Sequence, residues 1–472
     1  MTTLASKASF LVRAAVAARS MPWLVVRLVA VVVFLVVGYF AVRDLVGFPA
    51  LQWMAQYRFE DFRGFQDLAL FLRELRTGVP PLLASLEVSC HLLFGDASFM
   101  LEDVYRLAFV LAFLLPPLFF SRSKIEFALS YAISMFFMLA AAKIVPLNPQ
   151  TYDIYFSLLA LLFIVAARGC IHAKTAAARR FLALLAGLSL GAFELCRPFA
   201  LLLVPVLLLH GYRVIRPHSP RLFVLLLIPF LLISGGWHLK LAILQDGQVL
   251  ISNYGGRNLF QTWKPLLKEV SDPKLEPPVI RRGSPQYRQL TEKRFQGTGR
   301  LARLKLDTAW FSRSSAEQMR VVRRFALGHP LLAVKYTFVE MLDTLGGHTV
   351  FFLRHGAGVS PFGPSPIRHP DLYALVVRAT ALYAFLNGLW LIVRWVRERS
   401  LSFLAEPATA VIGVLFVALG ITSIAESGEE ARSLVSLLPL LACLPRTFEL
   451  PKRTDPGPGQ RPQRPFSRSQ LP

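Results

Sequence analysis

The chain has 472 residues, of which 54% are hydrophobic and 17% are charged, with 52 Lys and Arg against 29 Asp and Glu. Several of its apolar runs reach the roughly 20 residues that a helix needs to cross a hydrocarbon core. A soluble domain of this length cannot bury that many long apolar helices, so the composition excludes a soluble globular protein. We predict an all-α polytopic membrane protein, a bundle of about 10–12 transmembrane helices with short helices in its outer loops.

The formal net charge of +23 would also suit a nucleic-acid partner, because clustered Lys and Arg neutralise phosphates. Much of this charge, however, lies in short connections between apolar runs, where it orients helices. We therefore expect an anionic lipid or a lipid-linked phosphate as the partner, and no nucleic acid. The four cysteines have no ligand-like spacing, so neither a disulfide framework nor a zinc site is predicted. They are Cys90, Cys170, Cys196 and Cys443.

The N-terminal region begins with a basic segment and an apolar run. Residues 1–20 contain three basic residues and no acid, and the run at 22–42 is longer than a signal-peptide core and lacks a small-residue cleavage site. It is expected to be an uncleaved first helix with its N-terminus in the cytoplasm. A polar loop at 44–103 follows, and its Pro-Pro pair predicts two short helices, one before Pro80 and one from Leu82 to Phe94.

Six further spans are predicted before residue 242, and their connections alternate in charge. The spans are near 104–120, 125–145, 152–168, 181–195, 198–215 and 221–241. The basic connections are 121–124, 167–180 and 212–221, whereas those at 146–153 and 194–198 are short and nearly neutral. This alternation is the positive-inside pattern, which puts the basic connections in the cytoplasm and the loop at 44–103 outside it.

The C-terminal half begins with the largest polar block, residues 242–328, which parity also puts outside the cytoplasm. The segment at 330–352 is expected to be re-entrant or to cross twice, because the strongly basic residues 394–400 then lie in the cytoplasm. Later spans are expected near 372–393, 404–425 and 432–447.

The predicted organisation therefore has four parts. They are a transmembrane module at 1–241 that includes the loop at 44–103, an extracytoplasmic basic loop at 242–328, transmembrane helices at 329–450 and a disordered basic cytoplasmic tail at 451–472. Three polar features then share the outer face: the loop with Glu60 and Asp61, the basic loop, and the acid-rich turn at 426–433. We expect a functional site where they converge.

A series of short motifs in this chain follows an order known from one enzyme class. The series comprises Glu60-Asp61, Phe65, Ala69, Gly78, PPL at 80–82, FGDAS at 94–98, YRL at 105–107, GGWHLKLAI at 235–243, SNYGGRNLF at 252–260 and GEEARS at 428–433. The order resembles the C-type (GT-C) integral-membrane glycosyltransferases, which include protein O-mannosyltransferase-like and aminoarabinose transferase-like enzymes. The acidic pair is Glu-Asp where Asp-Glu is common in this class, and no Lys precedes the Pro pair as it does in the aminoarabinose transferases. The sequence therefore does not identify the donor sugar.

The resemblance implies a GT-C-like fold in a bacterial-type cell membrane and an inverting transfer of a sugar from a polyprenyl-phosphate-linked donor. The acceptor would be a hydroxyl or amine of a lipid, glycan or protein outside the cytoplasm. Such a transfer needs a carboxylate that accepts the acceptor's proton, and general-base catalysis contributes about 10²–10⁴ in rate. We predict Asp61 as the base, Glu60 as the second choice and Asp67 as the third. The alternative is that these acids only solvate a loop helix and pair with nearby arginines.

The leaving phosphate needs cations, because negative charge accumulates on it as the glycosyl bond breaks. The residues predicted to bind it are Arg197, His238, Lys240, Arg257 and Arg432, with Glu430 orienting Arg432. Their alternative role is snorkelling at the membrane interface or helix capping. The sequence contains no recognisable metal-ligand cluster, so no cofactor is predicted, and a divalent ion would have to use the carboxylates already named.

Two other functions are compatible with the sequence. A lipid-linked-substrate transporter or flippase would also use arginines for a phosphate headgroup, and a non-catalytic GT-C-fold scaffold would explain the altered acidic pair. Transporters typically contain inverted repeats and broken helices with charges near mid-membrane. The sequence reveals no convincing repeat, which favours the transferase.

Overall fold

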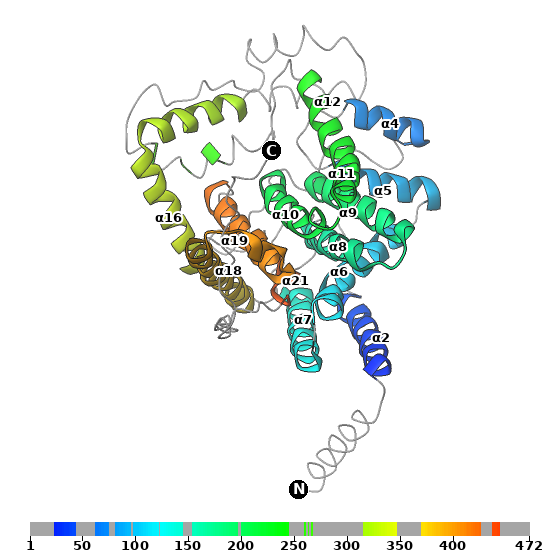
Figure 1. Ribbon diagram of the computed structural model, residues 1–472. Helices are drawn as coiled ribbons and strands as arrows, with labels where there is room; N and C mark the ends of the chain where they lie inside the picture. The colour runs from blue at the N-terminus through cyan, green and yellow to red at the C-terminus, as the bar shows by residue number, and fades with distance from the viewer. Residues whose placement is uncertain are drawn as a thin grey trace, which may run out of the picture.

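The structure is a computed structural model, and every regular element among the residues that it describes is a helix (Figure 1). The described residues are 23–43, 62–74, 81–95, 98–121, 123–144, 153–196, 200–244, 259–260, 263, 266–267, 315–346, 370–425 and 437–443. This confirms the all-α prediction. Residues 315–328 are helical as well as the labelled elements. The labelled elements are α2 (Trp23–Val42), α4 (Phe65–Glu74), α5 (Pro81–Phe94), α6 (Ser98–Phe119), α7 (Lys124–Ile144), α8 (Asp153–His172), α9 (Ala176–Cys196), α10 (Ala200–Ile215), α11 (Pro220–Phe230), the π-helix η2 (Leu231–Gly235), α12 (Gly236–Leu244), α16 (Pro330–Gly346), α18 (Pro370–Glu398), the 3₁₀-helix η5 (Ser402–Ala405), α19 (Pro407–Ala425) and α21 (Leu438–Leu441).

Six helical segments in the described part of the chain are long and apolar enough to cross a membrane, so the protein is a polytopic membrane protein. The segments are Trp23–Val42, Lys124–Ala142, Tyr155–His172, Ala176–Cys196, Pro220–Ile243 and Leu375–Glu398. Three shorter apolar helices accompany them, at Ala200–Ile215, Pro330–Val339 and Pro407–Ile421. Each span predicted between residues 22 and 241 coincides with a helix. The predicted total of about 10–12 crossings stays a prediction.

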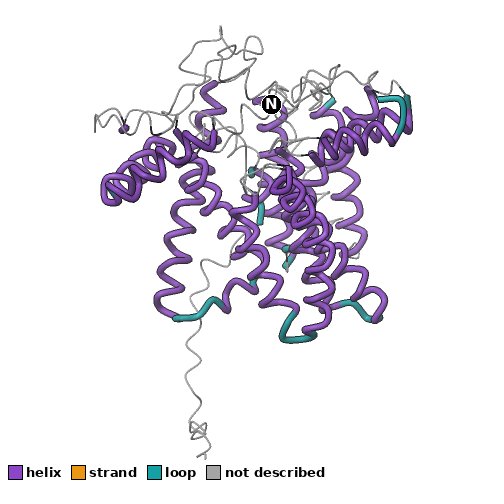
Figure 2. Tube along the Cα trace, turned by 90° about the horizontal axis from the view of Figure 1, so that it is seen from above, coloured by secondary structure: helices purple, strands orange, loops and turns teal. Residues whose placement is uncertain are grey.

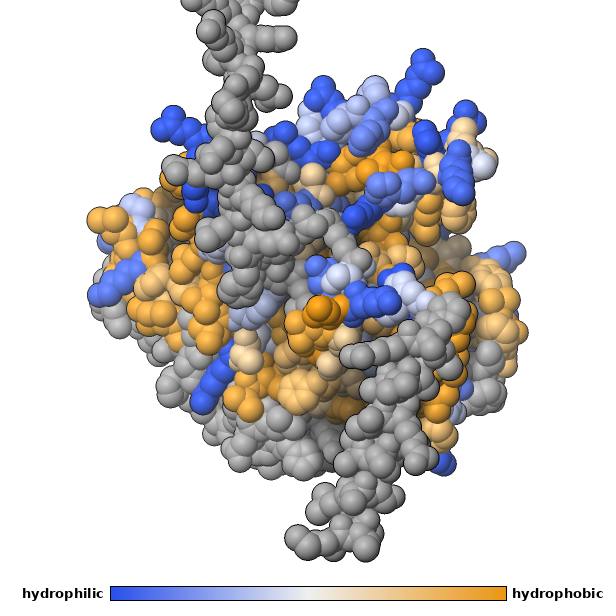
Figure 3. Space-filling view, turned by 60° about the horizontal axis from the view of Figure 1, so that its bottom comes forward, coloured by the Kyte–Doolittle hydropathy of each residue, from blue (hydrophilic) through white to orange (hydrophobic). Residues whose placement is uncertain are grey.

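The apolar surface of the helices fits a lipid environment. On α2 the side chains of Leu24, Leu28 and Val32 follow one another at helical spacing and are 68%, 56% and 58% exposed. Figure 3 shows apolar side chains over much of the described surface in that view. Exposed apolar side chains on this scale would be unfavourable in water, whereas lipid tails solvate them.

The centre of the bundle is the α8–α9 hairpin, with α10 and α11 packed against it. Phe156 of α8 and Phe193 of α9 are fully buried, and their ring centroids lie 4.2 Å apart. At Gly187 of α9, an added Cβ would lie 2.1 Å from the carbonyl oxygen of Leu226 in α11. Only glycine therefore permits this backbone approach, which is how small residues bring membrane helices together.

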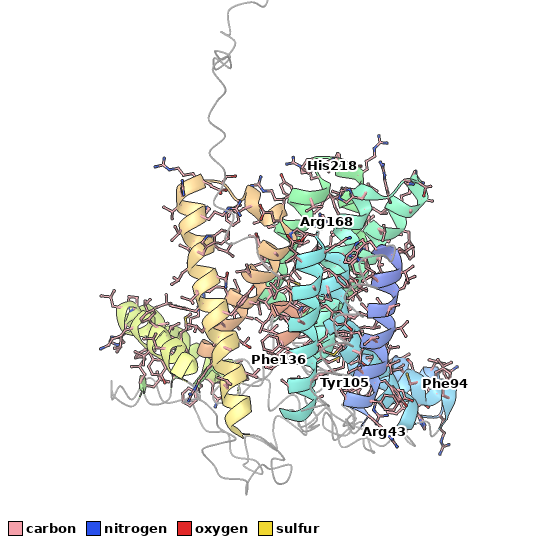
Figure 4. All side chains as sticks on the ribbon, turned by 90° about the horizontal axis from the view of Figure 1, so that it is seen from below. Arg43, Phe94, Tyr105, Phe136, Arg168 and His218 are labelled. Atoms are coloured by element: carbon pink, nitrogen blue, oxygen red, sulfur yellow. The ribbon has the colours of Figure 1, made fainter. Side chains whose placement is uncertain are left out.

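The bundle has two different ends. Arg168 and His218 lie at one end, and Arg43 and Phe94 lie at the other (Figure 4). We call the first the turn end, because it contains the connections at 173–175 and 216–219; Figure 2 shows most of the short turns gathered there.

The connection at 399–406 also belongs to the turn end. Phe403 of η5 packs in an apolar cluster with Leu391 and with Leu209, which lies in the last two turns of α10. The basic residues 394–400 thus lie near the other basic connections. Which side of the membrane this end faces stays a prediction.

We call the opposite end the loop-helix end, because it contains the short helices α4 and α5 (Figure 1). The prediction of one helix before Pro80 and a second from Leu82 to Phe94 is confirmed. Helix α4 buries Leu68 and Phe71 and exposes Phe65. Its partner α5 packs against α6 and α9, so the two helices are anchored to the central hairpin.

Candidate functional site

Two of the predicted phosphate-binding residues, His238 and Lys240, lie together on α12 at the loop-helix end. The Lys240 ammonium donates a hydrogen bond to the carbonyl oxygen of Leu72 in α4. It also lies 4.0 Å from the centroid of the Trp237 ring, within the range of a cation–π interaction. Lys240 therefore joins α12 to the loop helix that follows the Glu60-Asp61 pair in the sequence.

A pocket of about 390 Å³ opens next to Lys240, between α4, α5, the end of α9 and the η2–α12 segment. Its polar lining side chains are Arg73, Ser85 and Lys240, and its walls are mainly apolar, with Leu72, Leu195 and Trp237 among them. Two cations beside apolar walls suit a ligand with an anionic head and an apolar chain, because the cations bind the head and the walls contact the chain.

Glu194 and His238 form a buried pair between α9 and α12. The Nε2 atom of His238 lies 2.7 Å from Oε1 of Glu194, and the two side chains are 17% and 3% exposed. The other carboxylate oxygen, Oε2, has no hydrogen-bond partner among the described residues. Burying a carboxylate costs free energy unless it is fully paired, so this half-satisfied acid marks a functional candidate. Glu194 was missed by the sequence analysis.

The helix that positions this pair is interrupted by one π-helical turn, η2. Helix α11 begins at Pro220, and Ser219 caps it by accepting a hydrogen bond from the Leu222 N–H at 3.4 Å. The π turn then packs onto α9, because a Cβ on Gly191 would lie 3.0 Å from Cβ of Ile233. Ile233 also lines the pocket. Single π turns inside helices are frequent at functional sites.

The predicted acidic pair borders this region in the sequence. Glu60 and Asp61 lie outside the described residues, as do Arg197, Arg257, Glu430 and Arg432. The residue that follows Asp61 is Phe62, which is 5% exposed. Its ring packs edge-on against Phe71 of α4, with centroids 5.5 Å apart. The chain is thus fixed to the pocket helix directly after Asp61.

Asp67, the third choice as a base, has a capping contact at the start of α4. Its Oδ2 atom accepts a hydrogen bond from the backbone N–H of Arg63 at 2.7 Å. An acid in the first turn that reaches back to a preceding N–H stabilises the helix start. The structure thus gives Asp67 a local structural role.

The described residues contain no group of three or more His, Cys, Asp or Glu side chains that could hold a metal ion. The prediction that the protein works without a cofactor remains a prediction.

Comparisons with known proteins gave one structural match. No family model and no curated protein matches the chain. A solved structure that does match is the crystal structure of ArnT from Cupriavidus metallidurans in the apo state, at 16% sequence identity and a TM-score of 0.32, covering 84% of this chain and 77% of ArnT. ArnT is an aminoarabinose transferase of the GT-C kind, the class that the sequence motifs resemble. At this TM-score the match carries no argument about the activity of the present chain.

Proposed function

We propose that the protein is a membrane glycosyltransferase of the GT-C kind, which transfers a sugar from a polyprenyl-phosphate-linked donor to an extracytoplasmic acceptor. The observation that carries the proposal is the pocket at the loop-helix end, where Lys240 and Arg73 line an apolar cavity. It adjoins α4, which begins four residues after Asp61 in the sequence. Cations, an apolar wall and an acid close by in the sequence are the groups that such a transfer requires.

The pocket supports a role in donor binding. Arginine and lysine donate charge-assisted hydrogen bonds to phosphate oxygens, and these bonds strengthen as the leaving phosphate gains negative charge. The apolar side chains of Leu72, Leu195 and Trp237 offer a surface for the first isoprene units of the lipid. His238 was predicted to bind the same phosphate, but its Nε2 atom is bonded to Glu194, so only Nδ1 is left for a phosphate oxygen. Lys240 and Arg73 are therefore our preferred phosphate ligands.

In the proposed reaction Asp61 accepts the proton of the acceptor hydroxyl or amine. The acceptor atom then attacks the anomeric carbon, and the bond from that carbon to the phosphate oxygen breaks with its electron pair remaining on the oxygen. One displacement of this kind inverts the configuration at the anomeric carbon. The burial of Phe62 against Phe71 supports Asp61, because Phe62 is the next residue in the sequence and packs on the pocket helix.

The orientation in a bacterial-type cell membrane is part of the proposal. The connections at the turn end and the helix ends next to them carry exposed cations, with Lys174, Arg180, Arg216, Arg221 and Arg399 among them. The positive-inside rule assigns such short basic connections to the cytoplasm. The pocket at the opposite end would then face outside, where lipid, glycan and protein acceptors are available.

Transfer from a panel of polyprenyl-phosphate sugars tests the proposal. We expect the unmodified protein, in membranes or purified, to transfer at least one sugar, and Asp61→Asn to lower the rate by about 10²–10⁴ through loss of the base. Asp67→Asn is the matched control, because its side chain can still accept the capping hydrogen bond, and we expect nearly normal transfer. Normal transfer by Asp61→Asn would remove Asp61 as the base.

A lipid-linked-substrate transporter or flippase is the second candidate, and two structural observations favour it. The span Pro220–Ile243 contains the π turn η2, and Glu194 lies buried in the span Ala176–Cys196. Interrupted helices and intramembrane charges are typical of transporters. If the unmodified protein transfers no sugar in the panel but moves a labelled polyprenyl-phosphate sugar across proteoliposomes, this second function replaces the first. Failure of both assays would support a non-catalytic scaffold.

A further inference from the structure

The Glu194–His238 pair is not explained by stability. Glu194 is 3% exposed and has only one of its two oxygens hydrogen-bonded within the described residues. It also lies in the last turn of α9, where the negative end of the helix dipole disfavours an acid. Replacing a buried ion pair by apolar residues is often neutral or stabilising. An acid that the fold accommodates under three unfavourable conditions points to a function.

The position of His238 relates the pair to the pocket. On α12, Trp237 precedes His238 and Lys240 follows it two residues later, and both of these neighbours line the pocket. Nε2 of His238 is bonded to Glu194, so Nδ1 is the ring nitrogen left for another partner. Glu194 is followed by Leu195, which also lines the pocket, so the carboxylate orients an imidazole one residue away from the pocket lining on both helices. A carboxylate orients the histidine of a catalytic triad in the same way.

Charge balance indicates which form of the pair accompanies a phosphate. An ionised Glu194 beside a neutral imidazole would place a net negative charge next to the bound phosphate. A protonated imidazole would cancel that charge and leave the cations of Lys240 and Arg73 to act on the phosphate. A donor phosphate is therefore best accommodated with a proton on His238.

We infer that Glu194 and His238 are the general-acid pair of the transfer, with His238 donating a proton to the departing lipid phosphate and Glu194 orienting His238. The inference rests on the proposed function and assigns a role to two residues beyond it. Lys240 and Arg73 then bind the donor, Asp61 acts at the acceptor, and the pair acts at the leaving group.

In the proposed step the acceptor atom forms a bond to the anomeric carbon while Asp61 takes the acceptor's proton. The bond between the anomeric carbon and the phosphate oxygen breaks, and that oxygen keeps the electron pair and takes the proton from Nδ1 of His238. The products are the glycosylated acceptor and a singly protonated polyprenyl phosphate. Water then returns a proton from the Asp61 carboxylic acid to His238.

The test separates kcat from KM in variants of the pair. In Glu194→Gln the amide can still bond to the imidazole but carries no charge, and in His238→Gln the side chain cannot donate a proton to the leaving group. We expect both to lower kcat by about 10²–10⁴, as for loss of a general acid, with the donor KM nearly unchanged. The double variant should be no slower than His238→Gln alone, because the two residues act as one unit.

Two further measurements distinguish loss of the acid from a folding defect. Ser189→Ala is the matched control, since Ser189 is a buried polar residue on the same helix and is 4% exposed. We expect it to keep normal kcat. In His238→Ala, added imidazole should restore part of the lost rate, because a free imidazole can donate the missing proton in the space that the side chain leaves.

Each outcome decides the inference. A normal kcat in Glu194→Gln and His238→Gln, or a raised KM with unchanged kcat, overturns the acid role and leaves the glycosyltransferase proposal intact. If the two Gln variants are poorly folded, a folded His238→Ala variant that imidazole does not rescue overturns it. No transfer by the unmodified protein with any donor overturns the proposed function, and the acid role with it.

Discussion

The two ends of the helix bundle use charged residues differently. At the turn end Arg394 pairs with Glu398 and Glu406 at 2.7 and 3.3 Å, and all three side chains are between 23% and 34% exposed. At the loop-helix end Glu194 is 3% exposed and has an oxygen without a partner among the described residues. Solvated and fully paired charges indicate orientation and stability, whereas buried and partly paired charges indicate chemistry. Burial distinguishes the two roles better than charge does.

The largest effect that would test this contrast is expected at Lys240. Lys240→Glu removes the hydrogen bond to Leu72 and the cation–π contact with Trp237, and it places a negative charge next to a bound phosphate. We expect donor affinity to fall about 10²-fold, near the upper end of the range for a hydrogen bond to a charged group. Binding of radiolabelled polyprenyl phosphate to the purified protein measures it.

The matched control for Lys240 is Lys335→Glu on α16, an exposed lysine away from the pocket. It should leave donor binding unchanged. Equal affinity in Lys240→Glu and the unmodified protein would mean that the phosphate binds elsewhere. The charged residues at the loop-helix end would then not be evidence of a donor site.

An intermediate effect, on stability, is expected where α9 and α11 meet. In Gly187→Ala the new Cβ would lie 2.1 Å from the Leu226 carbonyl oxygen and 2.5 Å from Cγ of Pro229. The backbones must therefore separate, and overpacking of this kind costs about 1–3 kcal/mol. A lower thermal midpoint in detergent should reveal it. Gly420→Ala on α19 is the control, because nothing lies within 4 Å of its added Cβ; a midpoint as low as that of Gly187→Ala would contradict the packing argument.

The smallest effect is expected at the turn end. Arg394→Gln removes ion pairs to Glu398 and Glu406 and contacts with the Trp390 and Phe403 rings. Because the charges are partly solvated, the loss of stability should be about 1 kcal/mol or less. Sugar transfer should not change. A decrease in kcat comparable to that of Glu194→Gln would show that the turn end takes part in the reaction.

The sequence predicted the membrane helices well because the signal is local. Apolar runs of span length gave α2 and the helices from α7 to α12, and the Pro pair at 80–81 separated α4 from α5. The positive-inside pattern agrees with Arg168 and His218 lying at one end. These features depend on neighbours in the chain, so one sequence is enough to find them.

The candidate site was predicted only in part, because it depends on contacts between distant segments. The sequence analysis places Glu194 at the start of the nearly neutral connection at 194–198. Glu194 is nevertheless the single charged residue between Phe181 and Cys196. A lone acid in an apolar span was a usable signal. Its pairing with His238 joins residues 44 positions apart and could not be read from either segment.

The π turn was not predicted from the sequence, which predicts only a span near 221–241. Pro229 and the Gly235-Gly236 pair were the available signals. Both are also compatible with a regular α-helix. The wider turn is accompanied by the packing of Ile233 against Gly191, a contact between distant segments that the sequence does not reveal.

The π turn sets the rotational phase of everything after it. A π turn holds one more residue than an α turn, and each residue advances a helix by about 100°. Without η2, the residues of α12 would be rotated by about that angle relative to α11. Trp237, His238 and Lys240 would then face other neighbours. One additional residue in the turn, whose side chain takes no part in the proposed reaction, therefore determines which side chains of this span face the pocket.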